Sequence, residues 1–469
     1  MTLIQIFLFA ALALLAGRFY KVVNRNWLLF VASVLAVFWL QPASAIRNLF
    51  FFLPCLSLSL AALVWALTLP RDVRFGSADR RAVALLVGLV LLLSATRYFE
   101  PLCCLTASRP PQIELVAFLL AVITGFIFIL YRWGRSRNEF LDLTILFILL
   151  IFIVLKSEPV ALRVSAGLRS LGGQDPQLAS SLDIGWLGFS YIAFRLIHTL
   201  RDRLAGRLPR VSLRDFVTYI VFFPALTAGP IDRIERFQGD LQRNFTWQPD
   251  QIFLAGRRLV MGLFMKFILA DALAFFALNS INAVQTQSSV WMWLLLLAFS
   301  FRLFFDFAGY TQIAIGLGML FGILLPENFN RPYLQPNLTA FWNSWHITLA
   351  QWFRSYYFNP LTRFLRIRNL PVWLIILFAQ LSTMALIGLW HGITWNFLAW
   401  GLWHGGGLFV HNQWAQFTKT RSIVRNPKLS LSFGIVATFA FVTLGWVWFA
   451  LPQPADAFRV FRILFGIAA

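Results

Sequence analysis

Long apolar runs separated by short polar and basic segments recur along the whole chain. Before residue 210 these runs predict helical spans near residues 2–17, 27–40, 49–69, 82–96, 113–131, 141–155 and 184–200. A hydrocarbon core about 30 Å thick needs about 20 apolar residues in a helix, and a helix satisfies its own backbone hydrogen bonds in lipid. The pattern therefore predicts an all-α, polytopic integral membrane protein.

From Val211 onward, polar residues, prolines and glycines interrupt the apolar runs. Segment 222–233 contains Pro224, Gly229 and Pro230. Irregular backbone at membrane depth is tolerated only where it faces protein or a cavity, so we expect a broken or re-entrant element there. We also expect a helix that begins near Thr339, with that residue as its N-cap, and continues through His346.

The same pattern divides the chain into three regions. Residues 1–200 form N-terminal transmembrane helices, in which segment 156–183 is expected to be a polar loop. Residues 201–412 carry polar motifs inside apolar sequence, and residues 413–469 form a C-terminal transmembrane helix and tail.

Composition supports a membrane protein and removes nucleic acid as a partner. The 469 residues are 59% hydrophobic and only 13% charged. The 40 basic and 19 acidic residues give a net charge of +21, which in a soluble protein would indicate nucleic-acid binding. Here the basic residues occupy short loops, as the positive-inside rule expects. This rule places the arginine-rich segment 201–214 in the cytoplasm, and the N-terminus and segment 156–183 outside.

The candidate chemistry centres on His346 and His391, which lie among tryptophans in apolar sequence. An ionisable group inside a membrane is costly unless it is paired or used, and a shielded imidazole can act as a general base. We expect packing roles for His198 and His411. His404 is open between packing and function, with packing slightly favoured.

Residues close to these histidines in sequence or in the apolar helices are candidates for lining a substrate tunnel: Asn343, Trp345, Trp390, Asn396, Asp306 and Tyr310. For Asp306 a structural role, holding an arginine or backbone groups, is favoured over a direct one. No HExxH motif occurs and carboxylates are scarce nearby, so no metal site is predicted. The chain also lacks a G-x-S-x-G elbow and a Walker loop, which argues against a serine hydrolase and an ATP-driven pump.

Six motifs, in this order along the chain, resemble the membrane-bound O-acyltransferase family, in the bacterial branch that modifies alginate and teichoic acid. They cover about residues 210–412 and are 224–233, 306–310, 328–333, 341–346, 352–354 and 390–392. The resemblance implies about 11 to 14 transmembrane or re-entrant helices around a central funnel or tunnel. It also implies a multi-pass protein of the bacterial inner (plasma) membrane.

The resemblance further implies a reaction and roles for the two histidines. His391 matches the family's near-universal histidine and is cast as general base toward an acceptor hydroxyl. His346 matches a second marker position and would orient the acyl carbonyl or relay a proton. No permanently bound cofactor is expected.

The expected donor is a cytoplasmic thioester, either acetyl-CoA or an acyl carrier protein. The expected acceptor is an extracytoplasmic polysaccharide or a partner transferase. Acetyl transfer is the favoured reaction, and D-alanyl transfer from a carrier protein is the alternative. A transporter or flippase that forms no ester is a hypothesis of another class, because broken helices also mark transport paths.

Overall fold

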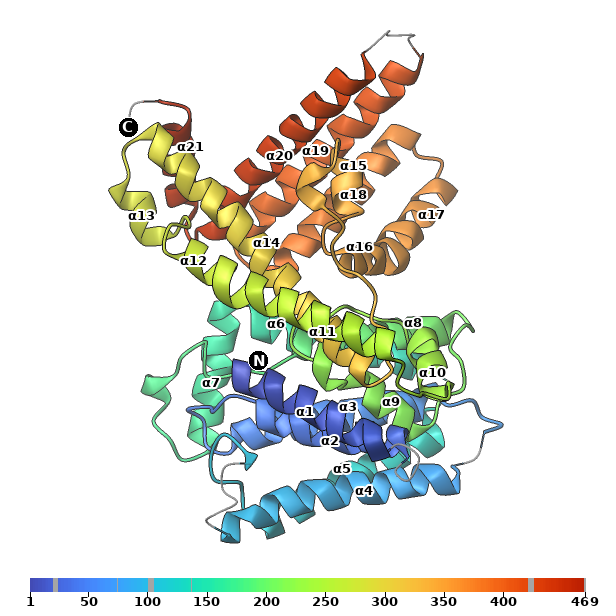
Figure 1. Cartoon of the computed structure of the whole chain (residues 1–469). Coiled ribbons are helices and arrows are strands. Elements are labelled where there is room, and N and C mark those ends of the chain that lie inside the picture. The colour runs from blue at the N-terminus through green and yellow to red at the C-terminus, as the bar shows by residue number, and fades with distance from the viewer. Residues whose placement is uncertain (20–23, 74, 100–104, 136, 421–425, 468–469) are drawn as a thin grey trace. The chain divides into compact units, whose positions relative to one another are not determined.

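The regular structure of the chain is helical throughout the described residues. The computed structural model describes residues 1–19, 24–73, 75–99, 105–135, 137–420 and 426–467 (Figure 1). Within these ranges the one extended pairing is an isolated antiparallel bridge between Phe329 and Trp345. The prediction of an all-α fold is confirmed.

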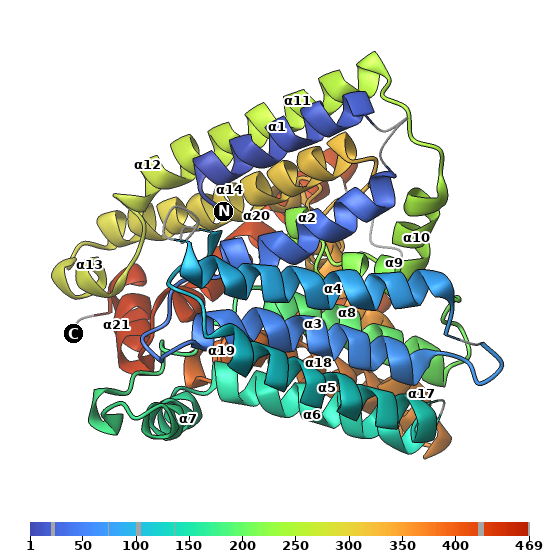
Figure 2. The same cartoon turned by 90° about the horizontal axis from the view of Figure 1, so that it is seen from below.

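One compact unit contains residues 1–257 together with 314–325. Its core helix, α3, packs against α5, α6, α8 and α9, and Figure 2 shows α3, α4, α5 and α6 running alongside one another. The helices of this unit are α1 (Leu3–Phe19), α2 (Arg25–Leu40), α3 (Leu49–Thr68), α4 (Ser77–Ala95), α5 (Ile113–Trp133), α6 (Asn138–Lys156), α7 (Glu158–Leu171), α8 (Phe189–Leu204), α9 (Leu213–Ile220) and α10 (Ile234–Gln242).

The second unit contains residues 258–313 and 326–469. In it α18, α19 and α20 pack side by side in sequence order (Figure 1). Two helices, α11 (Pro249–Phe264) and α14 (Ser289–Leu320), have residues in both units. The remaining helices of this unit are α12 (Asp271–Ala274), α13 (Ser280–Gln285), α15 (Leu338–Trp342), α16 (Ile347–Phe353), α17 (Asn359–Ile367), α18 (Val372–His391), α19 (Trp395–Thr420), α20 (Pro427–Ala450) and α21 (Pro454–Leu464).

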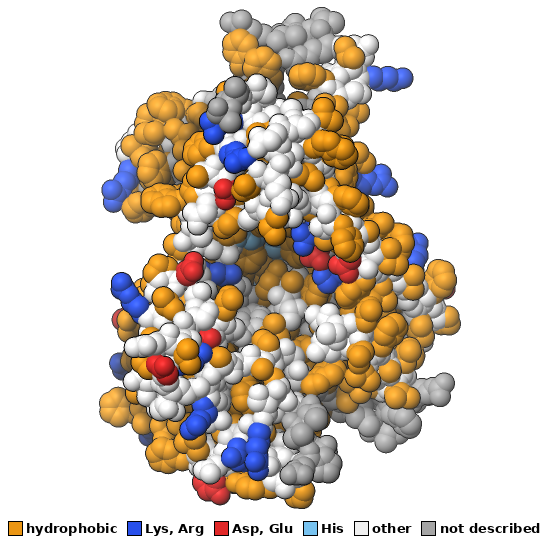
Figure 3. Space-filling model, turned by 90° about the vertical axis from the view of Figure 1, so that its left-hand side faces the viewer, with side chains coloured by type: hydrophobic (Ala, Val, Ile, Leu, Met, Phe, Trp, Pro, Cys, Tyr) orange, Lys and Arg blue, Asp and Glu red, His pale blue; other side chains and the backbone are white. Residues whose placement is uncertain are grey.

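The long apolar helices confirm a multi-pass membrane protein. Among the described residues, six helices have the length and apolar composition to cross a membrane, namely α3, α5, α6, α14, α18 and α20. The apolar helices α1 and α2 are shorter. Only 6% of the most apolar stretch of α5 is buried, so this helix offers its side chains to lipid, and Figure 3 shows apolar side chains over much of the face in view. The central funnel stays a prediction.

The break predicted at 222–233 is present. Helix α9 ends at Ile220, a short 3₁₀ turn covers Phe223–Ala225, and the next helix begins at Ile234. Arg195, which is buried in α8, donates to the carbonyls of Ile220 and Ala225 at 2.9 and 3.0 Å. One guanidinium thus satisfies carbonyls freed where the helix stops. His198 has the expected packing role, because its Nε2 lies 3.1 Å from the Tyr219 hydroxyl.

Segment 156–183 is not a loop throughout, because it contains the 14-residue helix α7. This helix is amphipathic, so its apolar residues are spaced along one face and form no long run. The pattern of apolar runs therefore did not predict it. Its Arg169 pairs with Asp183 at 2.8 Å, and both side chains are buried. Burial raises the pKa of the Asp183 carboxyl, but hydrogen bonds from Arg169, Ser165 and the Ser180 N–H outweigh it and hold the pKa below its usual value.

Candidate active site

His346 lies in a break between two short helices and not inside one long helix. Asn337, not Thr339, caps α15, accepting from the Ala340 N–H at 2.8 Å. The chain leaves the helix after Trp342, and His346 takes a left-handed conformation with φ +42°. The predicted helix from Thr339 through His346 is therefore wrong.

Pairing with a distant segment explains the break. The Asn330 N–H donates to the Ser344 carbonyl, and the Ile347 N–H donates to the Asn328 carbonyl, each at 3.0 Å. These bonds flank the Phe329–Trp345 bridge. Because residues 344–347 satisfy their backbone groups across the chain, they do not continue the helix.

Asn328 contacts the His346 ring and settles which of its nitrogens is protonated. The Asn328 Oδ1 accepts from the Thr348 hydroxyl at 2.7 Å and from the Thr348 N–H at 3.1 Å, which identifies the oxygen end of the amide. The His346 Nδ1 lies 3.4 Å from this oxygen. Since a carbonyl oxygen only accepts, Nδ1 carries a hydrogen, and in the neutral imidazole Nε2 then carries the lone pair.

The lone-pair nitrogen of His346 is shielded from water. The whole residue is 3% exposed, and within the described part of the chain Nε2 has no hydrogen-bond partner. Phe307 stands edge-on to the imidazole, with ring centroids 4.6 Å apart. A buried acceptor of this kind is available to a hydroxyl that enters the site.

Trp390 joins the two predicted catalytic histidines. Its ring centroid lies 6.0 Å from that of His346 and 4.5 Å from that of His391. The His391 ring also contacts Trp400 and Phe449, at 5.5 and 4.7 Å. The second unit therefore brings His346, Trp390 and His391 together although His346 is 45 residues from His391.

A second layer of aromatic rings surrounds this group. Trp345 packs among Phe329, Tyr333 and Trp446 with centroids 5.1–5.6 Å apart. His404 has no exposed surface and lies 5.0 Å from Trp400. These rings keep water from His346 and His404, while His391 is partly exposed. Exclusion of water strengthens electrostatic interactions around His346.

The other predicted tunnel residues have separate partners. Asn343 is exposed and accepts from Arg354 at 2.6 Å. Asn396 is buried and donates to the Leu451 carbonyl at 2.6 Å, which ties α19 to the end of α20. Asp306 forms an ion pair with Lys266, so its partner is a lysine and not an arginine. Tyr310 is buried one turn further along α14.

Two cavities open close to the histidine group. One has a volume of about 230 Å³ and is lined by Trp342, Arg354, Gln380, Thr383 and Ile387, among others. Ile387 lies one turn before His391 on α18. The other, of about 330 Å³, is lined by Arg302 and Asp306 of α14 and by Phe449. Phe449 also touches His391, so Asp306 does line a cavity next to the site.

Several residues that contact the two histidines were not among the predicted ones, including Asn328, Phe307, Trp400 and Phe449. Asn328 begins one of the recognised motifs, so its sequence context was a usable signal. Trp400 and Phe449 lie on α19 and α20 in aromatic-rich sequence, where no local signal separates a site residue from a packing residue. Among the described residues, no three His, Cys, Asp or Glu side chains gather as metal ligands do.

Comparison with known proteins gives the same family as the sequence motifs. The sequence model of MBOAT, the membrane-bound O-acyltransferase family, matches residues 112–451. The probable alginate O-acetylase of Azotobacter vinelandii is 34% identical over 60% of this chain and 54% of its own length. The peptidoglycan O-acetyltransferase of Helicobacter pylori is 34% identical over 54% of this chain and 47% of its own.

A third relative is matched over a larger share. The teichoic acid D-alanyltransferase of Streptococcus thermophilus is 30% identical over 74% of this chain and 84% of its own length. The chain spans about half the length of the two acetyl-transferring relatives. The family model covers well over half of the chain and includes both histidines. The protein belongs to the membrane-bound O-acyltransferase family.

Proposed function

We propose that this protein transfers an acyl group, in the first place acetyl, from a cytoplasmic thioester to a hydroxyl of an extracytoplasmic polysaccharide or of a partner transferase. The observation that carries the proposal is the pair of imidazoles in contact with one indole, Trp390, with His346 buried and His391 partly exposed among aromatic rings. The protein would act in the inner membrane of a bacterium, where such a donor and acceptor are on opposite sides.

In the proposed reaction the acceptor oxygen attacks the thioester carbonyl carbon. His391 takes the hydroxyl proton as the new C–O bond forms, and it returns a proton to the sulfur when the C–S bond breaks. The products are an ester and a free thiol. His346, whose Nε2 is buried with a lone pair, would orient the reacting group or relay the proton.

The cavity beside α18 supports a route for the donor. Its lining mixes apolar side chains with Arg354, Gln380 and Thr383. The Gln380 Oε1 is buried without a partner among the described residues, so it is available to an N–H of a bound molecule. A third cavity has a volume of about 440 Å³ and is lined in part by Arg363 and Arg366 of α17. These two arginines would attract the phosphates of a thioester donor.

D-alanyl transfer from a carrier protein is the second candidate. One relative, matched over 84% of its own length, is named a teichoic acid D-alanyltransferase. Carrier proteins are typically acidic, and the arginines of α17 would suit such a partner. Mass analysis of the modified acceptor separates the candidates, because an added acetyl group and an added alanyl group differ in mass.

The test uses the full-length protein in liposomes with radiolabelled acetyl-CoA inside and the isolated acceptor outside. His391→Ala should lower the rate of ester formation by about 10²-fold to 10⁴-fold, the usual contribution of a general base. The matched control is Phe378→Ala, an exposed position on the same helix, which should keep full activity.

Two results would contradict the proposal. Full ester formation by His391→Ala would remove the assigned base. Movement of substrate across the liposome membrane without any ester would instead support a flippase, since a flippase transports its substrate unchanged.

A further inference from the structure

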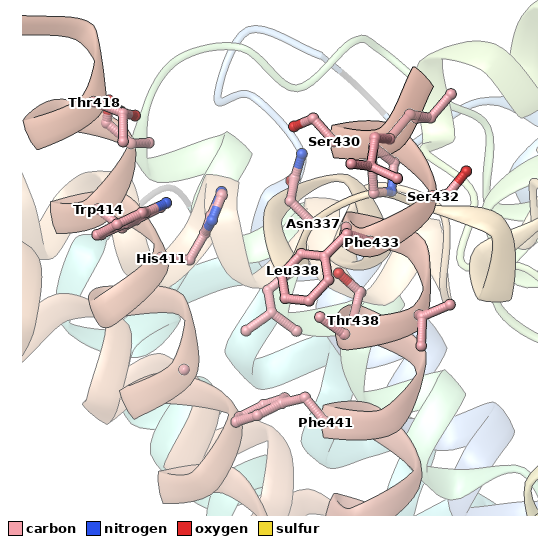
Figure 4. A pocket seen from close by; sticks show the side chains of 18 of the residues that line it. Asn337, Leu338, His411, Trp414, Thr418, Ser430, Ser432, Phe433, Thr438 and Phe441 are labelled. Atoms are coloured by element: carbon pink, nitrogen blue, oxygen red, sulfur yellow. Dashed lines mark hydrogen bonds between the residues drawn. The ribbon is translucent and has the colours of Figure 1, made fainter. Parts of the chain in front are cut away.

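An open groove lies between α19 and α20, away from the two histidines that the proposed reaction uses. Its volume is about 1560 Å³, larger than the ~300–1,000 Å³ typical of small-molecule pockets. Figure 4 shows His411 and Trp414 of α19 facing Phe433 and Thr438 of α20 across this space. His411 therefore lines an open groove, whereas the sequence led us to expect a packing role.

The walls of the groove are apolar and exposed. Large apolar side chains on both helices line it, with exposed fractions of 52–75%: Val410, Trp414, Leu429, Phe433 and Val436. Since α20 has the length and apolar composition of a membrane-spanning helix, its apolar side chains in the groove are expected to face hydrocarbon. Contact between these apolar walls and water would cost a free energy of ~25 cal/mol per Å² of apolar surface. Acyl chains are therefore favoured over water in the groove.

Polar side chains line the groove at several places, with His411, Asn337 and Thr438 among them and a further group near the α19–α20 connection. Thr418, Ser430 and Asn426 line it where α19 ends and α20 begins, while Phe441 lies toward the opposite end (Figure 4). This end also holds the N-terminus of the 24-residue helix α20, where the Asn426 side chain already accepts from the N–H groups of Lys428 and Leu429. The positive end of the helix dipole still favours an anion nearby. The groove thus combines apolar walls with hydroxyl and amide groups close to a helix N-terminus.

Charge identifies the kind of lipid. The sequence holds no Asp or Glu between Glu327 and Asp456, whereas Lys419, Arg421, Arg425 and Lys428 follow one another in sequence from the last residues of α19 to the first residues of α20. Arg421 and Arg425 lie outside the described residues, and Lys428 is exposed. Basic residues beside a membrane helix mark the cytoplasmic leaflet, whose surface carries anionic lipids.

We propose that this groove binds one anionic glycerophospholipid of the cytoplasmic leaflet. The acyl chains would lie along Phe433 and Val436, and the phosphate would lie at the end formed by Thr418 and Ser430. Bound there, the lipid would hold together α19 and α20, which carry Trp400 and Phe449 against His391.

Native mass spectrometry of the purified full chain tests the site. The protein is equilibrated with vesicles of phosphatidylcholine alone or mixed with phosphatidylglycerol, and retained lipid is counted. We expect one phosphatidylglycerol retained in preference to phosphatidylcholine. Ser430→Asp and Lys428→Gln should each weaken this retention about fivefold, the effect of about one charge near a membrane surface. The matched control for charge is Ser288→Asp, at an exposed position outside the groove.

A second pair of variants tests the apolar part. Val436→Trp should fill the groove and remove the retained lipid, whereas Val290→Trp should not, although the two valines are 66% and 70% exposed. Equal retention of both lipids, or equal retention by wild type and Val436→Trp, would overturn the proposal. So would a second copy of the chain or a partner helix found in the groove in place of lipid. Ester formation is not the readout, so the result does not depend on the proposed reaction.

Discussion

At the scale of single residues, the contact between Asn328 and His346 matters most for the proposed chemistry. The oxygen of Asn328 accepts from both polar hydrogens of Thr348, so it can only accept from the imidazole. This arrangement leaves the buried Nε2 of His346 with its lone pair. Asn328 is thus a positioning residue, because it acts through His346.

Asn328→Ala should disturb this arrangement. Without the acceptor, both ring tautomers become accessible, and ester formation should fall, because a smaller share of the molecules then presents the Nε2 lone pair that the proposed role of His346 needs. Nitrogen NMR of ¹⁵N-histidine-labelled protein should show the His346 tautomer change. Asn328→Asp keeps an acceptor at the same place and should retain the original tautomer. An unchanged ¹⁵N signal in Asn328→Ala would contradict the assignment.

At the scale of secondary-structure elements, the close approach of α18 and α19 places the aromatic rings of the site. A Cβ added at Gly401 would lie less than 3.0 Å from the Met384 carbonyl oxygen, and one added at Gly388 would lie equally close to the Phe397 carbonyl oxygen. Small residues allow membrane helices to pack this closely. Gly401 adjoins Trp400, so the helix spacing determines where this ring meets His391.

Gly401→Ala should push α19 away from α18. Such overpacking costs about 1–3 kcal/mol, and the displaced Trp400 should lower the rate of ester formation. The matched control is Gly406→Ala on the same helix, where an added Cβ would meet no atom within 4 Å. That variant should be neutral or slightly more stable, because alanine favours helix over glycine by ~1 kcal/mol. Thermal unfolding in detergent measures both, and equal unfolding temperatures would argue against a tight helix contact.

At the scale of the whole molecule, the distribution of basic loops predicts how the chain crosses the membrane. Segment 201–214 should face the cytoplasm and segment 156–183 the outside. Segment 156–183 contains the amphipathic helix α7, and the Arg169–Asp183 ion pair joins this helix to the chain that follows it. The predicted topology therefore places this helix on the outer side.

Cysteine labelling of intact cells tests this topology. Leu182 and Ala205 are exposed, one in each segment. In a background where Cys55, Cys103 and Cys104 are replaced by serine, an impermeant thiol reagent should label Leu182→Cys directly. It should label Ala205→Cys only after the membrane is permeabilised. Labelling of Ala205→Cys in intact cells would reverse the predicted orientation.

The sequence by itself determined the helical membrane class, most of the helices before residue 210, the break at 222–233 and the family. These features are local: lipid forces each apolar run to satisfy its own hydrogen bonds, and the motifs are contiguous. The amphipathic helix α7 was not predicted, because its apolar residues form a stripe along one face and not a continuous run.

Only the tertiary structure decided the geometry of the site. The helix break at His346 arises from backbone pairing with Asn328 and Asn330, and the contact of Trp390 with His346 joins α18 to the break before α16. Hydrogen bonds and ring contacts between residues far apart in the chain depend on how helices pack. The periodicity of a single segment does not predict that packing.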